Sequence, residues 1–287
     1  MRLADLAPRA KELSDRRVPF VHAVVVRAQR PTSVRPGDAA IVHADGSIEG
    51  FVGGACAETS VRLHGLRVLE TGEPLVLELR PDEETSDDVR EGVVTAHNPC
   101  LSGGELEIFL EPCLPAASML IAGHGPIAEA LADLAGRVGF HVTSPDLAPD
   151  TAAVVVAAHG RDEEELLAEA LRQGVPYVAL VASPKRGNAV RASLELPEEL
   201  RRQLHSPAGL DIGARTPAEI AVSIVAEILA ERQRVPAHPV TAAPATAIDP
   251  VCGMEVAVTD AAISLERDGE HVYFCSEGCR ERYGAPR

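Results

Sequence analysis

The sequence predicts an α/β protein with two larger domains and a small third unit. A length of 287 residues exceeds what one hydrophobic core ordinarily holds. Strand and helix patterns alternate in the middle of the chain, which indicates βαβ units and a parallel sheet. Near the C-terminus, a proline-rich segment precedes three cysteines at metal-binding spacing. We therefore expect a mixed α+β domain over 1–115, a parallel-sheet domain over 116–234, a linker over 235–247 and a ββα-type metal-binding module over 248–287.

The composition excludes several classes of protein. Hydrophobic residues make up 46% and charged residues 24%, which is the balance of a folded globular chain. The formal net charge of −16 would repel nucleic acid and anionic membranes at long range. The N-terminus has no apolar signal-peptide core, and no run of about 18 uncharged apolar residues occurs. We expect a cytoplasmic protein with reduced cysteines, no nucleic-acid partner and no membrane insertion.

The first domain should contain a hairpin, a helix and further strands. The dipeptide Asp45-Gly46 lies between two apolar runs and is the strongest short hairpin signal. A helix is expected from the segment GGACAE to Gly72, where a C-terminal stop belongs. The acidic segment PDEETSDD is interpreted as a solvated loop, and Pro112 and Pro115 mark the domain boundary. Strands are predicted at 18–27, 39–42, 48–52, 75–79 and 105–111.

The second domain carries a glycine-rich turn between a strand and a helix. Gly123, Gly125 and Ala128 match a G-x-G-x-x-A pattern, in which the backbone approaches a pyrophosphate at a helix N-terminus. Asp146 follows at the distance expected of a ribose-binding acid. The pattern favours a Rossmann-like domain and NAD(P) binding, although a tight turn that binds no nucleotide gives the same signal. Further strands are predicted at 119–122, 141–143, 154–157 and 177–181.

The last helix of this domain has the clearest start signal. Thr216 is a natural N-cap, Pro217 suits the first turn, and Glu219 completes a capping box. His124 and His159 follow strands at the expected ligand edge of the sheet. We interpret both histidines as structural, because neither has an identified partner.

The C-terminal unit contains the strongest local motif of the chain. Cys252 is followed by Cys275 and Cys279, and thiolates are the soft ligands that zinc and copper(I) prefer. A fold of about forty residues buries too little apolar surface to be stable without such a cross-link. His271 is a candidate fourth ligand, although a lone strand histidine is more often structural. The alternative is a small hairpin with two buried cysteines and no metal.

Two glycine-rich segments of the first domain could bind an anion. They are Gly53-Gly54-Ala55-Cys56-Ala57-Glu58 and Cys100-Leu101-Ser102-Gly103-Gly104. Adjacent glycines before a helix leave amides free, and a cysteine at a helix N-terminus should have a lowered pKa. Cys56 is therefore a candidate nucleophile or sulfur contact, or else a buried residue of a tight turn. Cys100 has the same two interpretations, whereas Cys113 is interpreted as incidental.

These segments resemble the signatures of a known family. The segment PTSVRPGDAAIVHADGSIEGFVGGACAE is similar to the N-terminal signature of the XdhC/CoxI family, and CLSGGELEIFLEP is similar to its second signature. The segments GHGPIAEAL and LDIGARTPAEIAVSIVAEIL resemble its C-terminal Rossmann-like domain, so the match covers nearly all of 18–231. The C-terminal segments DPVCGMEV and VYFCSEGC resemble the YHS and TRASH group of metal-binding modules.

The resemblance implies an accessory role without turnover of its own. Such a protein binds molybdenum cofactor, holds it while its terminal sulfur is installed, and passes it to a xanthine dehydrogenase- or CO dehydrogenase-type molybdenum hydroxylase. The first signature and the CLSGG segment look closer to the CO dehydrogenase branch, which suggests copper delivery to a molybdenum-copper site as an extension. The implied partners are the client enzyme, a cysteine desulfurase as sulfur donor and a second copy of the chain in a homodimer.

The implied cofactor-binding residues suit the chemistry of molybdopterin. Its phosphate and dithiolene call for backbone amides, an arginine and a thiol. Ala55 stands where the family pattern leads us to expect glycine. The residues carried over are Arg35, Gly53, Gly54, Cys56, Glu58, Cys100, Gly103 and Gly104, with Gly123 and Gly125 as a nucleotide turn and Cys252, Cys275 and Cys279 as metal ligands.

Two other functions compete with this one. An NAD(P)-dependent oxidoreductase would use the Gly123 turn, with Cys56 or a histidine as acid or base, but no hydride-transfer constellation accompanies the turn. A metal sensor or metallochaperone would act through the C-terminal cysteines, with the first two domains only dimerising. Retained cofactor binding without residues 235–287 would separate these alternatives from the accessory role.

Overall fold

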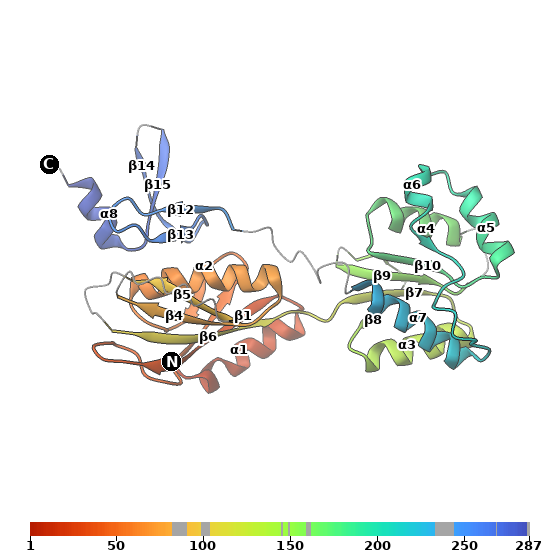
Figure 1. Cartoon of the computed structure of the whole chain (residues 1–287), viewed down its shortest axis with the longest axis horizontal. Coiled ribbons are helices and arrows are strands. Elements are labelled where there is room, and N and C mark those ends of the chain that lie inside the picture. Colours follow the sequence, from red (N-terminus) through yellow and green to blue (C-terminus); the bar gives the residue numbers. More distant parts are fainter. Residues whose placement is uncertain are drawn as a thin grey trace. The chain divides into compact units, whose positions relative to one another are not determined.

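The chain folds as two compact units (Figure 1). The first consists of Met1–Pro115 together with His238–Arg287, and the second of Ala116–Ala237. No helix among the described residues is long and apolar enough to span a bilayer. The computed structural model describes residues 1–81, 91–98, 104–144, 146–148, 150–158, 162–232, 244–267 and 269–285.

A six-stranded sheet forms the centre of the first unit, in the order β3-β2-β1-β6-β4-β5. Its neighbouring strands are antiparallel except for the parallel pair β4 and β5. The predicted hairpin at Asp45-Gly46 is confirmed as the turn between β2 and β3. Strand β5 was not expected from the sequence. The strands are β1 (Phe20–Ala28), β2 (Ala39–His43), β3 (Ile48–Gly50), β4 (Leu75–Arg80), β5 (Val93–His97) and β6 (Leu106–Cys113).

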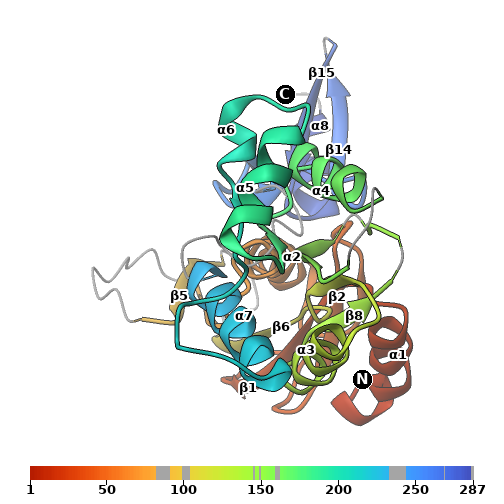
Figure 2. The same cartoon turned by 90° about the vertical axis from the view of Figure 1, so that its right-hand side faces the viewer.

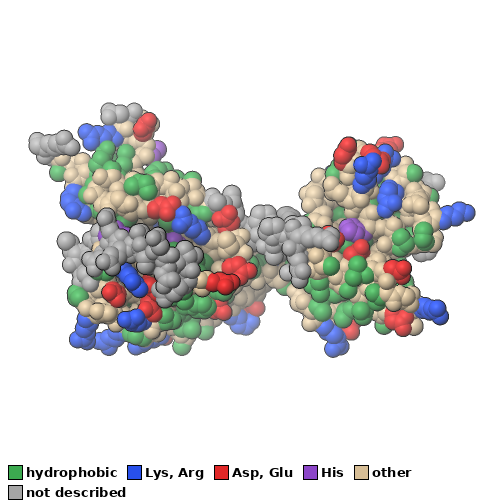
Figure 3. All heavy atoms as spheres, viewed as in Figure 1, with side chains coloured by type: hydrophobic (Ala, Val, Ile, Leu, Met, Phe, Trp, Pro, Cys, Tyr) green, Lys and Arg blue, Asp and Glu red, His purple; other side chains and the backbone are tan. Residues whose placement is uncertain are grey.

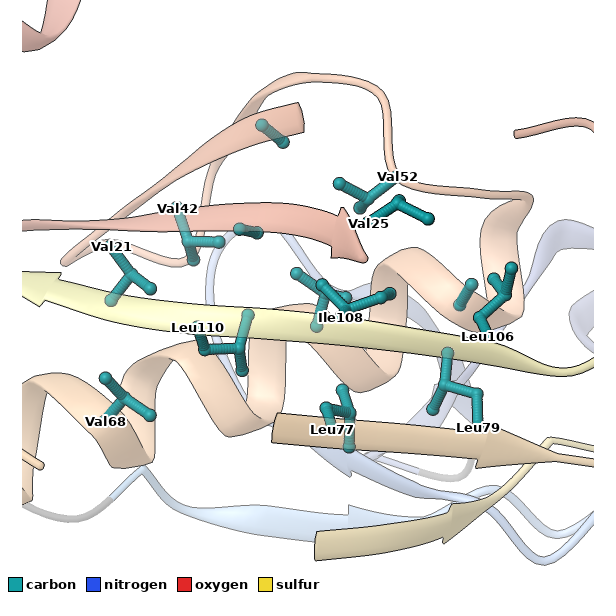
Figure 4. Close-up of a cluster of buried hydrophobic side chains, with 14 of the residues drawn as sticks. Val21, Val25, Val42, Val52, Val68, Leu77, Leu79, Leu106, Ile108 and Leu110 are labelled. Carbon is teal, nitrogen blue, oxygen red and sulfur yellow. The ribbon is translucent and has the colours of Figure 1, made fainter. Parts of the chain in front are cut away.

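One helix packs on each face of this sheet. Helix α2 (Ala55–Thr71) is the predicted helix, and it ends at Gly72 in the left-handed conformation. Its residues Ala57, Val61 and Val68 join the apolar side chains of β1, β2, β4 and β6 in one core (Figure 4). Helix α1 (Leu3–Asp15) packs Leu6, Ala10 and Leu13 against the other face. The sequence patterns did not predict α1.

The C-terminal segment forms a small module that packs on α2. Two antiparallel two-stranded ribbons precede a short helix, and Ala257 packs against Leu63 and Leu66 of α2. Strand β12 begins at Thr246, within the segment predicted as linker. The elements are β12 (Thr246–Ile248), β13 (Glu255–Ala257), β14 (Ile263–Arg267), β15 (Glu270–Phe274) and α8 (Glu277–Gly284).

The second unit is a parallel sheet with helices on both faces. Its strand order is β11-β10-β9-β7-β8, so the order reverses where β7 and β9 are neighbours. Helices α3 (Pro126–Arg137) and α7 (Pro217–Arg232) pack together on one face, whereas α4 (Asp162–Arg172) and α5 (Pro184–Ser193) cover the other (Figures 1 and 2). The short helix α6 (Glu198–Arg201) follows α5. The strands are β7 (Ser118–Ala122), β8 (His141–Thr143), β9 (Thr151–Val156), β10 (Tyr177–Leu180) and β11 (Leu204–His205).

The capping box predicted for the last helix of this unit is confirmed. The Thr216 hydroxyl accepts the Glu219 amide at 3.3 Å, and the Glu219 carboxylate accepts the Thr216 amide at 3.0 Å. These two bonds are the expected capping box at the start of α7.

On the face shown in Figure 3, acidic and basic side chains are interspersed, so that face does not gather the net charge into one patch.

Candidate functional site: a glycine-rich turn and a cysteine cluster

The turn before α2 requires glycine at its first position. Gly53 has a φ of +144°, and a Cβ there would lie 2.7 Å from the Ala57 Cβ. Gly54 is the N-cap residue, and the space that a Cβ would occupy is open. Amides of the first helical turn have no carbonyl partner within the helix. The turn therefore presents backbone donors beside the partly buried Cys56, at the positive end of α2.

The structure brings parts of the two predicted signatures together at this turn. A Cβ at Gly104 would overlap the Pro31 carbonyl, so Gly104 packs directly on the segment after β1. A Cβ at Gly53 would in turn lie 3.4 Å from Leu106, at the start of β6. Cys100 and Gly103 lie outside the described residues. Gly53, Gly104 and the segment at Pro31 therefore surround one end of the central strands.

The two charged residues predicted for this site have local partners. Glu58 accepts a hydrogen bond from Arg62 at 3.1 Å along the same helix, and Arg62 also donates to the Gly46 carbonyl at 2.7 Å. Arg35 is exposed, and its amide donates to Asp38 at 2.8 Å. That amide is the main cause of the lowered pKa of Asp38. Arg62 thus ties α2 to the hairpin and Glu58 pairs with Arg62, whereas the Arg35 side chain lies at the surface.

Cys275 lies at the centre of a cluster of sulfur atoms. Its Sγ is 3.4 Å from that of Cys252, 3.7 Å from that of Cys279 and 3.9 Å from that of Cys56. Cys275 and Cys279 are 1% and 2% exposed. In a tetrahedral thiolate site with metal–sulfur bonds of about 2.3 Å, neighbouring sulfurs are about 3.8 Å apart. The three cysteines predicted as ligands are therefore spaced to hold one thiophilic ion.

Asp249 is part of the cluster, and sequence reasoning missed it. Ligand atoms of Asp249, Cys252, Cys275 and Cys279 all lie within 4.8 Å of one another. The Asp249 side chain is fully buried and accepts the amides of Val251 and Cys275, both at 2.8 Å. The signal was its place in the segment DPVC, three residues before a predicted ligand. Asp249 holds together the two loops that carry the cysteines.

The thiols of this cluster resist ionisation without a cation. Burial raises the pKa values of Cys252 and Cys279, and the contact with Cys56 together with burial raises that of Cys275. A bound cation reverses this effect, because coordination removes the thiol proton.

His271, the other predicted ligand, is exposed on β15 and lies opposite Glu266, outside the group of four.

The second glycine-rich turn lies where the strand order of the parallel sheet reverses. Gly123 has a φ of +134°, and a Cβ there would lie 2.6 Å from the Ala157 carbonyl oxygen at the end of β9. Gly125 is the N-cap of α3, with Pro126 in the first turn. In open α/β sheets this reversal forms the ligand crevice. His124 and Asp146 are exposed, and His159 lies outside the described residues.

A charged pair beside this reversal was not predicted. Arg186 of α5 donates to the Ala158 carbonyl at 3.2 Å and pairs with the buried Glu163 of α4. This pair fixes the backbone just after β9, next to Gly123.

The fold and the two turns define the class of each unit. The second unit is a Rossmann-like domain with a glycine turn where its strand order reverses, and the first is a sheet-and-helix domain with a glycine–cysteine turn.

Two family models match the chain. One, described as the XdhC Rossmann domain, matches residues 119–228, and the other, described as the XdhC and CoxI family, matches residues 13–80. Together they account for more than half of the sequence. The chain belongs to the XdhC and CoxI family.

Individual relatives are more distant. The chain is 27% identical over 259 residues to the uncharacterized protein YqeB of Escherichia coli K12, and the match covers 79% of this chain and 46% of that protein. It is 28% identical over 178 residues to a protein of Bacillus subtilis 168 described as a probable xanthine dehydrogenase subunit, with 52% of each chain covered. The chain thus spans about half the length of these curated relatives. A solved structure described as a xanthine dehydrogenase from Bacillus halodurans is 17% identical, with 79% of this chain and 96% of that chain covered and a TM-score of 0.39.

Proposed function

We propose that this protein is an accessory factor in the maturation of a xanthine dehydrogenase-type molybdenum hydroxylase. Membership of the XdhC and CoxI family supports this role. The observation that carries the proposed site is that Gly53 of the Gly53-Gly54-Cys56 turn lies against Leu106, two residues after Gly104, which packs on the Pro31 segment. In this proposal the turn binds molybdenum cofactor, whose metal and dithiolene supply the hydroxylase chemistry after transfer to the client.

Each part of the turn has a role in that binding. The amides at the start of α2 bind the phosphate, because they lack helical partners and lie at the positive end of the helix dipole. In this proposal the Cys56 thiol contacts the sulfur-bearing end of the cofactor. Arg35 is the surface arginine that the family signature assigns to the same ligand. We further propose that the protein forms a homodimer and holds the cofactor while a cysteine desulfurase supplies its terminal sulfur. The client enzyme in this finer proposal is of the CO dehydrogenase type.

The backbone of the second unit suits a separate, nucleotide-binding site. The Gly123 turn lies where the strand order reverses and leaves open space at the Gly125 N-cap. Pro126 removes one amide that could face a pyrophosphate. We propose NAD(P) or a related nucleotide as its ligand, without assigning hydride transfer to the chain.

The experiment is to produce the protein in cells with an active molybdenum-cofactor pathway and to measure bound pterin and molybdenum. The intact protein should retain pterin, and Cys56→Ala should retain much less. Cys113→Ala is the matched control, because Cys113 is a partly buried thiol at the far end of β6. Absence of pterin from the intact protein, with a normal content of zinc or copper, would instead favour the metallochaperone function.

A further inference from the structure

Helix α2 is buried on two opposite faces. Ala57, Val61 and Val68 face the sheet core. Cys56, Thr59, Leu63 and Leu66 recur at helical spacing and form a second stripe. All four of these residues contact the C-terminal module. A helix with two largely apolar stripes needs a covering layer on each, so the module is the second layer over α2.

Polar contacts fix the module along this stripe. The Thr59 hydroxyl donates to the Cys275 carbonyl at 2.9 Å, and both residues are buried. Arg67 pairs with Glu255 of β13 at 2.7 Å. Because Thr59 lies one helical turn after Cys56, the bond to the Cys275 backbone brings the two thiols together. The Sγ atoms of Cys56 and Cys275 are 3.9 Å apart.

The three cysteines of the module need a fourth donor to complete a tetrahedral site. The two Asp249 oxygens already accept the amides of Val251 and Cys275, and a carboxylate is a hard ligand for a thiophilic ion. His271 is exposed on β15 and lies opposite Glu266 rather than a cysteine of the module. Cys56 is a soft donor, and its Sγ lies 3.9 Å from that of Cys275, close to the edge of about 3.8 Å between two sulfurs of a tetrahedral site. Cys56 lies outside the group of four in this structure, so ligation requires its Sγ to move towards those of Cys252 and Cys279.

We propose that Cys56 is the fourth thiolate of a metal centre shared between the start of α2 and the C-terminal module. The ligand is a thiophilic cation, zinc(II) or copper(I), held by Cys56, Cys252, Cys275 and Cys279. Each thiol releases its proton to solvent on binding, and no electron is transferred. Asp249 supports the centre through the backbone of Cys275.

The shared metal centre regulates the proposed cofactor site at the Gly53–Cys56 turn. This consequence depends on the proposed function. The thiol assigned there to the molybdenum cofactor becomes a metal ligand when the module is loaded. Metal and cofactor therefore compete for Cys56. Metal release frees the thiol at the glycine-rich turn, so the module acts as a metal-dependent cap on that turn.

The first test uses cobalt(II) in place of the native metal in the full-length protein under reducing conditions. The sulfur-to-cobalt charge-transfer absorption increases with the number of bound thiolates. Cys56→Ser should lower its intensity by about a quarter, because one of four thiolates is lost. Cys252→Ser should lower it at least as much, and Cys113→Ser should leave it unchanged. A Cys56→Ser spectrum equal to that of the intact protein would overturn the proposal.

The second test identifies the ion and separates the two proposals. Apo-protein is titrated with zinc(II) and with copper(I) against a chelator of known affinity. Cys56→Ser should weaken zinc binding more than copper binding, because copper(I) accepts three thiolates. Equal affinities in both proteins for both ions would refute the shared centre. None of these measurements involves molybdenum, so absence of pterin binding would contradict the proposed function while leaving the metal result intact.

Discussion

The two glycine-rich turns of this protein use the same two kinds of glycine in different surroundings. Gly53 and Gly123 have φ values of +144° and +134°. Gly54, the open N-cap of α2, directly follows Gly53, whereas His124 separates Gly123 from Gly125, the open N-cap of α3. The turn before α2 adds a thiol and lies under the cysteine module, whereas the turn before α3 adds Pro126 at the ligand edge of a parallel sheet. Similar glycine turns can thus carry different neighbouring side chains, and the proposed ligands of the two turns differ accordingly.

The largest effect is expected where the backbone of one turn contacts its sheet. Gly123→Ala should destabilise the second unit by about 4 kcal/mol, because the backbone is strained for alanine and the methyl group would overlap the Ala157 carbonyl. Gly125→Ala, two residues away in open space, should cost less than about 1 kcal/mol. Hydrogen exchange of β7 and β9 amides in the full-length protein measures the difference. Equal protection in the two variants would show that the strand contact does not require glycine.

The second prediction concerns the helix that follows the other turn. His64 of α2 is buried beside Arg67, and burial, then that charge, lowers its pKa to about 4 from an ordinary value near 6.5. Between these values the unfolded chain binds a proton that the folded chain does not. The contribution of His64 to the free energy of unfolding is therefore fully present above about pH 6.5. It is lost as the pH falls towards 4, and the loss is about 3 kcal/mol at most.

His64→Gln should flatten this part of the pH dependence. The free energy of unfolding of the first unit, measured from pH 7 to pH 4, should fall less steeply than in the intact protein. His141→Gln replaces an exposed histidine of the second unit and should leave the profile of the first unit unchanged. A slope that is the same with and without His64 would remove this residue as the cause.

The third prediction separates the ligands of the two turns. Gly54→Asp places a good N-cap residue in open space, so α2 should keep its stability while the added charge repels a bound phosphate. Pterin retention should fall by about tenfold or more, which corresponds to about 1.4 kcal/mol. Gly125→Asp makes the matched change at the other turn and should reduce nucleotide binding without affecting pterin. A pterin loss in Gly125→Asp alone would move the cofactor to the second unit.

The sequence patterns predicted most of the regular structure. Apolar runs, and one alternating segment at 105–111, located most strands of both sheets, Asp45-Gly46 located a hairpin, and Thr216 with Glu219 located the start of α7. Helix α1 was missed because its apolar face consists of only three buried residues on a polar helix that contains Pro8. Strand β5 was missed because its side chains are only partly buried, so its pattern is weak.

The sequence alone determined the family signatures, the two glycine-rich turns and the spacing of Cys252, Cys275 and Cys279, because each depends on residues close together in the chain. From the sequence, Cys56 was assigned to the glycine-rich turn, and Cys252, Cys275 and Cys279 were assigned to the C-terminal metal-binding module. Only the tertiary structure placed Cys56 beside Cys275, which is 219 positions away, and added Asp249 to the cluster. The reason is physical: the packing of the module on the second face of α2 brings these thiols together, and no local pattern encodes that contact.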